Sequence, residues 1–226
     1  MRSKFLYLLN GMIVFAMLLA ACGGGTSKNG DQPIYLAIIW HQHQPVYFKD
    51  PDTGIYAKPW VRVHATKDYV DMASMLEEYP DIHVTFNLTP SLIRQLDDLQ
   101  AGAKDLYWVT AEVPADQLTH EQQQFILERF FDTNREIIAR FPRYQELLEM
   151  RDGGSEYTTQ DYLDLQILFN LAWVDPAWLA QEPLSDLVSK GENFNESDKT
   201  ILFAEHLRLI NEVIPVHREL QDDGQI

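Results

Sequence analysis

Cysteine and basic residues are both scarce in this sequence, and each shortage restricts what the protein can be. The single cysteine, Cys22, has no partner within the chain, so no intramolecular disulfide can stabilise the fold. Lys and Arg total 18 against 34 Asp and Glu, which gives a formal net charge of −16. Because phosphate binding needs a surface rich in Lys and Arg, this acidity argues against nucleic acid as a partner.

Several signatures of catalysis are also missing. We find no nucleophile elbow, no glycine-rich phosphate loop and no cysteine cluster with zinc-ligand spacing. The composition nevertheless suits a folded domain, because 46% of the residues are hydrophobic and 12% are aromatic. Such a chain can bury a sizeable core, so the composition excludes wholesale disorder.

The first residues have the features of a bacterial lipoprotein signal. Arg2 and Lys4 precede the apolar run FLYLLNGMIVFAMLLA, and the segment ends in LAAC, whose cysteine is Cys22. This pattern resembles a lipobox, in which a peptidase cuts before the cysteine and a lipid is attached to its thiol. We therefore predict a lipoprotein signal peptide over residues 1–21.

The same segment predicts where the protein is held. An uncleaved membrane anchor is the alternative, but the apolar run is short for a spanning helix and lacks a basic stop-transfer flank. Residues 22–33, which include three consecutive glycines, are predicted to be a flexible tether. We expect an extracytoplasmic domain, on the periplasmic or cell-surface side of a membrane, anchored by lipid on Cys22.

The next part of the sequence alternates between strand and helix patterns. Residues 34–40 are apolar on every side, which predicts a strand covered on both faces, as in parallel sheets. A helix over 67–79 follows, with Thr66 as its N-cap, and residues 83–90 form a second short strand. A second helix is predicted over 91–100. This order indicates the start of a β/α barrel or of a doubly wound sheet.

The character of the sequence changes after residue 100. No strand pattern is found from 101 to 222, where helical patterns dominate, and the fold class is therefore α/β with a large helical insertion. The helices are predicted over 116–140, 142–151, 158–172, 183–190 and 196–221. Residues 46–66 are predicted to be a loop, and their many aromatic residues indicate that the loop lines a site.

Two histidines end the first strand. His41 and His43 are separated by one residue, so in an extended chain both imidazoles point to one face. The carboxyl ends of strands carry the active site in β/α barrels. The two rings could hold a metal, could hydrogen-bond hydroxyl groups of a substrate, or could be core histidines. Trp40, beside them, either stacks on a sugar or fills the core.

Two further groups of residues are candidates for the same pocket. Asn87 ends the second strand, where its amide can contact a ligand or cap the next helix. Trp60 and His64 lie in the segment PWVRVHATKDY, just before a helix N-terminus, where polar ligands can bind. The alternative for this segment is a set of surface ion pairs and a solvated histidine. Trp173 and Trp178 are interpreted as packing residues.

Five segments, in order along the chain, resemble glycoside hydrolase family 57. They are WHQHQPVYF, PWVRVHATKDY, FNLTPSLIRQL, LQILFNLAWVDP and a final GQI. The likeness covers residues 34–226 and is nearest to amylopullulanase-like and α-amylase-like members. It implies an incomplete, seven-stranded β/α barrel, of which residues 34–100 supply the first two strands, with a mainly helical region over 101–222.

The resemblance also implies a function. Members of this family are retaining hydrolases of α-glucans such as starch, pullulan or glycogen, and they use no metal or other cofactor in catalysis. The likeness implies that His43 of the HQP motif binds the sugar and that His41 shares its pocket. The catalytic Glu and Asp belong to later strands and have no counterpart here. We therefore expect an N-terminal part of the enzyme, inactive alone, whose barrel a downstream polypeptide completes.

Two other readings remain open at the level of the sequence. H-x-H at the first strand of a β/α barrel also marks metal-dependent hydrolases and deacetylases, in which the histidines bind a divalent ion that activates water. A surface lipoprotein that binds an α-glucan polysaccharide or oligosaccharide without cleaving it is equally compatible with the aromatic loop, the tether and the acidic composition.

Overall fold

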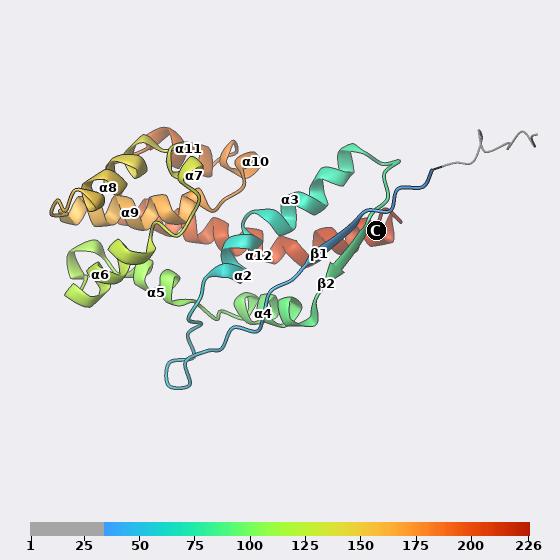
Figure 1. Ribbon diagram of the computed structural model, residues 1–226, viewed down its shortest axis with the longest axis horizontal. Coiled ribbons are helices and arrows are strands. Elements are labelled where there is room, and N and C mark those ends of the chain that lie inside the picture. Colours follow the sequence, from blue (N-terminus) through green and yellow to red (C-terminus); the bar gives the residue numbers. More distant parts are fainter. Residues whose placement is uncertain (1–33) are drawn as a thin grey trace, which may run out of the picture. The chain divides into compact units, whose positions relative to one another are not determined.

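The computed structural model describes residues 34–226, and Ala37–Ile226 form one compact unit (Figure 1). The predicted signal peptide (1–21), the lipidation site Cys22 and the tether (22–33) lie outside the described residues. Within the described part, no helix is long and apolar enough to cross a membrane. The elements are β1 (Ile39–Gln42), α2 (Trp60–Ala65), α3 (Asp68–Ser74), the 3-10 helix η2 (Met75–Glu78), β2 (Thr85–Leu88), α4 (Pro90–Gln100), α5 (Leu106–Glu112), the 3-10 helix η3 (Ala115–Gln117), α6 (His120–Arg129), α7 (Arg135–Ile138), α8 (Pro142–Asp152), α9 (Thr159–Ala172), α10 (Pro176–Leu179), α11 (Leu184–Lys190) and α12 (Glu196–Asp222).

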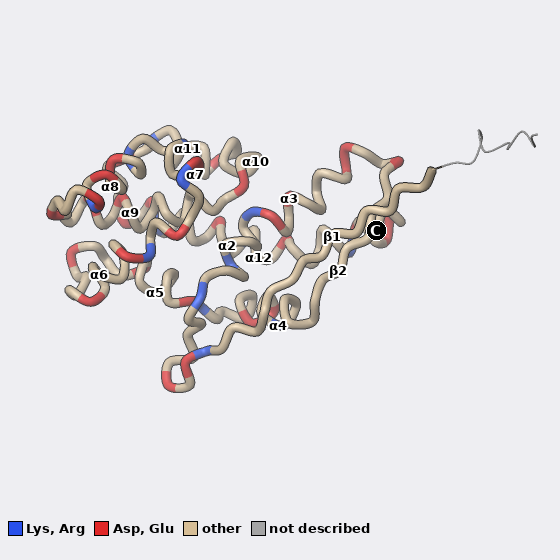
Figure 2. The backbone as a smooth tube through the Cα atoms, viewed as in Figure 1, with Lys and Arg blue, Asp and Glu red and all other residues tan. Residues whose placement is uncertain are grey.

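The two strands pair in parallel, as the β–α–β order of the sequence predicts. In their register Ile39 lies opposite Thr85, and His41 lies opposite Asn87. Neither strand contains a charged residue, and both are drawn without red or blue in Figure 2. The described residues therefore contain a two-stranded parallel sheet in a mostly helical chain, which is consistent with the start of a β/α barrel.

The first strand differs from its prediction in extent and in burial. It begins at Ile39 rather than at residue 34, and Ile39 itself is 67% exposed. Helices cover one face of the sheet, where Trp40 and Phe86 join a small core with Leu76 and Leu220. Within residues 34–226 no element covers the other face, so the predicted burial on both faces is wrong for this part of the chain.

The helical region after residue 100 is confirmed, although some helix boundaries differ. The predicted helix over 116–140 is divided into α6 and α7, because Thr119 and Asn134 are N-cap residues that each begin a new helix. The short helix α5 was not predicted; it begins where the Asp105 carboxylate accepts the Trp108 N–H. The predicted helix over 91–100 is α4, with Pro90 in its first turn.

The segment around residue 60 also differs from its prediction. Residues 60–65 form the helix α2 in place of a loop. Thr66 ends α2 and does not cap α3, because its hydroxyl donates to the carbonyls of Val63 and Trp173. Capping preferences could not anticipate this, since the second partner lies 107 residues further along the chain.

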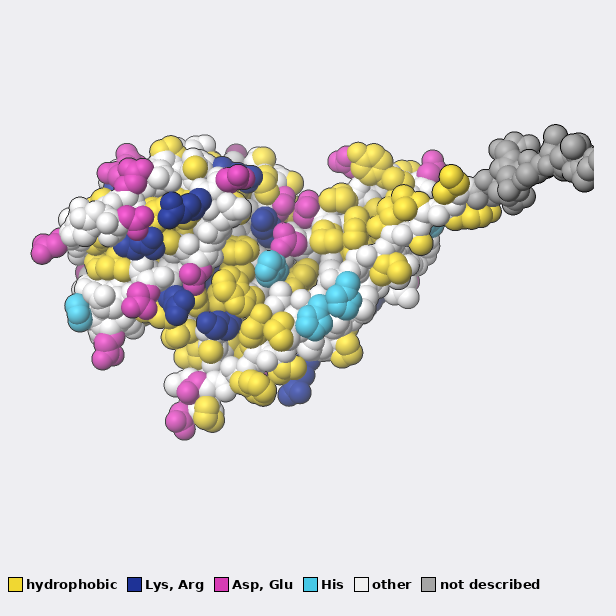
Figure 3. Space-filling view, viewed as in Figure 1, with side chains coloured by type: hydrophobic (Ala, Val, Ile, Leu, Met, Phe, Trp, Pro, Cys, Tyr) yellow, Lys and Arg dark blue, Asp and Glu magenta, His cyan; other side chains and the backbone are white. Residues whose placement is uncertain are grey.

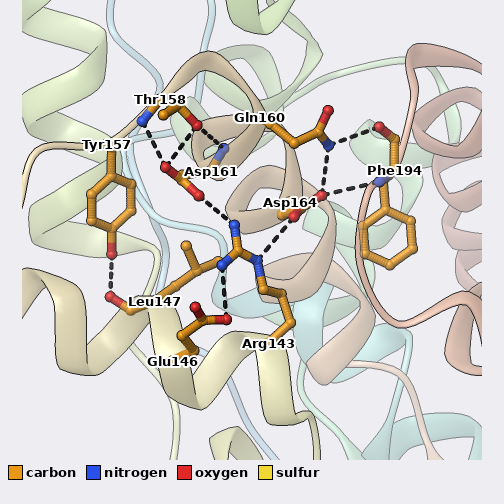
Figure 4. A network of polar contacts seen from close by, with 9 residues as sticks. All are labelled: Arg143, Glu146, Leu147, Tyr157, Thr158, Gln160, Asp161, Asp164 and Phe194. Atoms are coloured by element: carbon orange, nitrogen blue, oxygen red, sulfur yellow. Dashed lines mark hydrogen bonds and ion pairs between the residues drawn. The ribbon is translucent and has the colours of Figure 1, made fainter.

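A polar network joins α8, α9 and the loop before α12 (Figure 4). The Arg143 guanidinium on α8 pairs with Asp161 and Asp164 on α9, and its Nε lies 3.0 Å from Asp164 Oδ2. The other oxygen of Asp164 accepts the Phe194 N–H at 3.0 Å. Asp164 is fully buried, so this pairing satisfies a carboxylate that would otherwise be costly inside the protein.

A second buried charge, Arg62, connects four helices. Its Nε lies 2.6 Å from Asp105 Oδ2, and its Nη1 donates to Asn170 Oδ1 at 2.8 Å. The same nitrogen lies 3.2 Å from Nδ1 of His206, so that ring nitrogen is the acceptor. Burial, reinforced by the Arg62 charge, holds the pKa of His206 well below its usual range and keeps the ring neutral. The Arg62 guanidinium on α2 thus connects the N-terminus of α5 with α9 and α12.

Removing this guanidinium should destabilise the whole domain. In Arg62→Met the Asp105 carboxylate stays buried without its cation, and we expect the free energy of unfolding to fall by about 3–5 kcal/mol. Urea unfolding followed by tryptophan fluorescence measures this change. The control is Arg129→Met, which removes a partly exposed cation 3.9 Å from Asp132 and should change stability by less than about 0.5 kcal/mol. Equal effects of the two substitutions would contradict the role given to Arg62.

Candidate functional site

The end of β1 presents two histidines on one face. His41 and His43 are exposed, whereas Gln42 and Gln44 between and after them are buried. The two imidazole rings are nearly parallel, with an interplanar angle of 10° and centroids 5.5 Å apart. The prediction that both rings share a face is therefore confirmed. Histidine side chains gather on the face drawn in Figure 3, beside hydrophobic and acidic side chains.

Asn87 holds one of these rings. It lies opposite His41 in the register of the sheet, and its Nδ2 is 2.7 Å from His41 Nδ1. The amide N–H donates to this nitrogen, which leaves the ring proton on Nε2. The N-cap of α4 is Thr89. Of the two roles that the sequence allowed for Asn87, the structure thus supports a place at the edge of the histidine pair.

A second group of side chains surrounds His64 on α2. His64 Nδ1 pairs with Asp68, and the ring stands edge-on to Trp173 at 5.5 Å between centroids. Trp60 lies 6.0 Å from Trp173 in the same group. Trp60 and His64 were predicted to belong to the site; Trp173, predicted to be a packing residue, does pack against the main core and also contacts both of them. Trp173 lies more than 100 residues further along the chain, so only the folded structure brings these rings together.

Tyr69 connects the two groups. Its hydroxyl accepts a hydrogen bond from Gln44 Nε2 at 2.9 Å, and its ring lies 6.0 Å from that of His64. Burial is the main cause that raises the pKa of Tyr69 to about 12, so the phenol remains protonated at neutral pH. This hydrogen bond therefore ties the segment that carries the histidine pair to the helices that carry the His64 group.

Carboxylates give the His64 side of the site a negative field. Asp68 belongs to the pair with His64, and Asp71 follows one turn later on α3. Burial, and then the charges of Asp175 and Asp68, raise the pKa of Asp71 above its usual value. Such a field disfavours anionic ligands. Imidazoles, an amide and tryptophan rings instead suit a neutral ligand with many hydroxyl groups.

The structure separates Trp40 from this site. Side chains alternate along a strand, so Trp40 points to the face opposite His41. There it meets Phe86 edge-on at 5.0 Å and packs in the small core below the sheet. The prediction that Trp40 binds substrate beside the histidines is therefore corrected: of the two roles the sequence allowed, the structure gives it the packing one.

Metal binding by the histidine pair was the second reading of the sequence. Among residues 34–226, no three His, Cys, Asp or Glu side chains are grouped so that they could hold a metal ion. The Nδ1 atom of His41 is already occupied by Asn87. Within the described part of the chain, the two exposed rings can hydrogen-bond a ligand.

Fold and site together define a class of protein. A parallel β–α–β unit that presents polar side chains at the carboxyl ends of its strands is the binding edge of a β/α sheet. Residues 37–226 match the family model described as Glycosyl hydrolase family 57, so the chain belongs to that family. The resemblance seen in the sequence is thereby confirmed. No curated protein and no solved structure matches the chain.

The contact between Asn87 and His41 can be tested by NMR. We expect His41 to be the Nε2–H tautomer, because the Asn87 amide donates to Nδ1. Asn87→Leu removes that donor, so the ring should shift toward a mixture of tautomers, visible in the ring nitrogen shifts. His120, exposed on α6, is the internal reference and should not respond. A wild-type His41 protonated on Nδ1 would contradict the assignment.

Proposed function

We propose that this chain is the amino-terminal part of a retaining hydrolase acting on α-glucans of the starch, pullulan or glycogen type. The family membership supports hydrolysis of glycosidic bonds on α-glucan substrates. The observation that carries the proposal is the stacked, exposed pair of His41 and His43 at the carboxyl end of β1, with Asn87 beside it. In this proposal the ring nitrogens bind sugar hydroxyls, and the tryptophans of the His64 group border the glucan.

The two catalytic carboxylates belong, in this proposal, to further strands of the same sheet. Retaining hydrolysis needs a nucleophile and an acid/base carboxyl group about 5–5.5 Å apart. Of the carboxylates on the His64 side, Asp68 is engaged by His64, and Asp175 caps α10 by accepting the Ala177 N–H at 2.8 Å. Asp71 is then left without a second free carboxylate to form the pair, so we assign catalysis to polypeptide outside the described residues.

The outer edge of β2 supports this assignment. The Thr85 N–H donates to Ile38 O on the β1 side, whereas the preceding N–H, that of Val84, donates to Gln225 O at 3.0 Å on the other side. Gln225 thus begins the pairing that a third parallel strand would make. Its side chain is fixed by hydrogen bonds to the carbonyls of Leu76, Tyr79 and Ile82.

A groove lies beside the same edge of the sheet. It has a volume of about 390 Å³, and its lining includes Phe86, Leu88, Ile214 and His217. His217 is 95% buried, as its exposed fraction is 5%, and its Nε2 has no hydrogen-bond partner within the described residues. An added strand would cover the apolar wall and bring backbone groups to this nitrogen, as buried polar atoms require.

We place the protein outside the cytoplasm, anchored to a membrane by lipid on Cys22. This part of the proposal is supported by the sequence pattern of residues 1–22 alone. An enzyme in that position would meet glucans outside the cell or in the periplasm. A protein that binds glucan there without cleaving it is the second outcome that the experiments below can separate from hydrolysis.

The sugar-binding role of the histidine pair predicts a selective loss of affinity. The wild-type chain should bind maltoheptaose more tightly than cellohexaose, and His43→Ala should weaken maltoheptaose binding at least about tenfold, through the loss of hydrogen bonds to hydroxyls. Isothermal titration calorimetry measures both affinities. His120→Ala, on the exposed face of α6, is the matched control and should bind as the wild type does. Unchanged binding by His43→Ala would remove His43 from the site.

The proposed further strands predict a larger protein in the native cells. An immunoblot with antibodies against residues 34–226 should detect a band much heavier than the 26.2 kDa of this chain. The heavier species should release reducing ends from starch. A band at or below 26.2 kDa, with no second polypeptide bound to it, would contradict hydrolysis and favour glucan binding alone.

A further inference from the structure

We infer that Gln95 on α4 is a positioning residue, which holds residues 43–47, the irregular segment that follows β1 and carries His43, in the conformation that binds glucan. This inference rests on the proposed function for the identity of the ligand. The Gln95 side chain lies outside the ligand site and acts only through residues 43–47. Such support is needed because His43, Pro45 and Val46 are all exposed and bury little surface of their own.

The side-chain amide of Gln95 makes the hydrogen bonds with residues 43–47 that a neighbouring strand would otherwise make. Its Oε1 accepts the Tyr47 N–H at 2.9 Å, and its Nε2 donates to Pro45 O at 2.9 Å. These are the two backbone groups on either side of Val46, which is the pair that an adjacent parallel strand would engage. A single side chain thus continues the pairing of β1 beyond the point where β2 turns into α4.

The amide has no remaining freedom to turn. The second N–H of its Nε2 donates to Ser91 O, within α4, at 2.8 Å. Gln95 itself is only 3% exposed, so its amide depends on these bonds. All three of the amide's principal hydrogen bonds are therefore made, and losing the side chain would leave the partly buried Tyr47 N–H and Pro45 carbonyl without these partners.

Neighbouring side chains complete the clamp. Ser91 Oγ donates to Gln44 O at 2.6 Å. Side chains of α4 therefore bind two successive backbone carbonyls, those of Gln44 and Pro45. On its other side, the Gln44 amide bridges Tyr69 and Tyr47, at 2.9 Å and 2.8 Å. His43 is thus flanked by backbone atoms fixed to α4 and by a side chain fixed to α3.

The helix that carries the clamp is itself rigidly held. Leu92 and Leu96 on α4 are fully buried in the main hydrophobic core. Pro90 starts the helix directly after β2, so β1, β2 and the clamp share one rigid support. The position of the His43 ring is therefore fixed relative to the core of the protein, and does not depend on the exposed residues 43–47 alone.

The test compares two identical substitutions in one helix. Gln95→Met keeps the length of the side chain and removes its three hydrogen bonds. Gln100→Met is the control, because Gln100 donates to Ile210 O at 3.2 Å and makes no hydrogen bond to residues 43–47. For Gln95→Met we expect the His43 ring signals to move in NMR spectra and maltoheptaose affinity to fall about tenfold, which is about 1.4 kcal/mol. Gln100→Met should change neither.

Further variants separate positioning from a general loss of stability. Gln95→Glu keeps the acceptor for Tyr47 but places a carboxylate oxygen against the carbonyls of Pro45 and Ser91, so its affinity should fall at least as far as that of Gln95→Met. Gln95→Leu, which also lacks the three hydrogen bonds, carries the test if Gln95→Met fails to fold. Leu147→Ala weakens the same hydrophobic core from α8, away from α4 and from residues 43–47, and under folding conditions it should leave His43 signals and affinity unchanged.

The outcomes distinguish this inference from the proposed function. If Gln95→Met leaves the His43 ring signals where they are in the wild type, the positioning role is wrong. If Leu147→Ala lowers affinity as much as Gln95→Met does, the effect is structural and the role is also wrong. If the wild-type chain binds no maltoheptaose, the proposed function fails, while the His43 signals still report on the clamp.

Discussion

The buried ion pair between Arg62 and Asp105 is the constraint on which the rest of the structure depends. A charge inside a protein must be paired and hydrogen-bonded, and here one guanidinium meets Asp105 at the N-cap of α5, Asn170 on α9 and His206 on α12. These contacts restrict how the four helices can be placed relative to one another. α12 extends this placement to the sheet, since it contacts α9 and α2 near the pair and α3 and α4 near the strands (Figure 1).

The functional site is built on that framework from two sides. Arg62 lies on the same short helix as Trp60 and His64, so the charge that orders the core also fixes one side of the site. The other side is the end of β1, where His41 and His43 alternate with buried glutamines. Gln44 and Tyr69 join the two sides through one hydrogen bond. A neutral, hydroxyl-rich ligand is what this combination of imidazoles, amide and tryptophan rings can recognise.

The parts of the structure that follow from local rules could be predicted from the sequence. The alternation in His41-Gln42-His43-Gln44 gave the shared face of the imidazoles, and Pro90 with its following apolar positions gave α4. The burial of Arg62 could not be foreseen, because its partner Asn170 lies 108 residues away. Trp173 packs against the core as predicted, but its contacts with Trp60 and His64 could not be foreseen for the same reason. The extent of β1 was overestimated, because apolar residues alone do not say which strands and helices will cover them.

We propose that the carboxyl ends of β1 and β2 bind an α-glucan through His41, His43 and Asn87. The measurement that tests this binding most directly is an NMR titration of the chain with maltoheptaose, followed residue by residue. We expect these three residues, and the rings of Trp60 and Trp173, to show the largest changes. Changes confined to another surface, such as the pocket lined by Trp108 and Phe203, or no change at all, would contradict it.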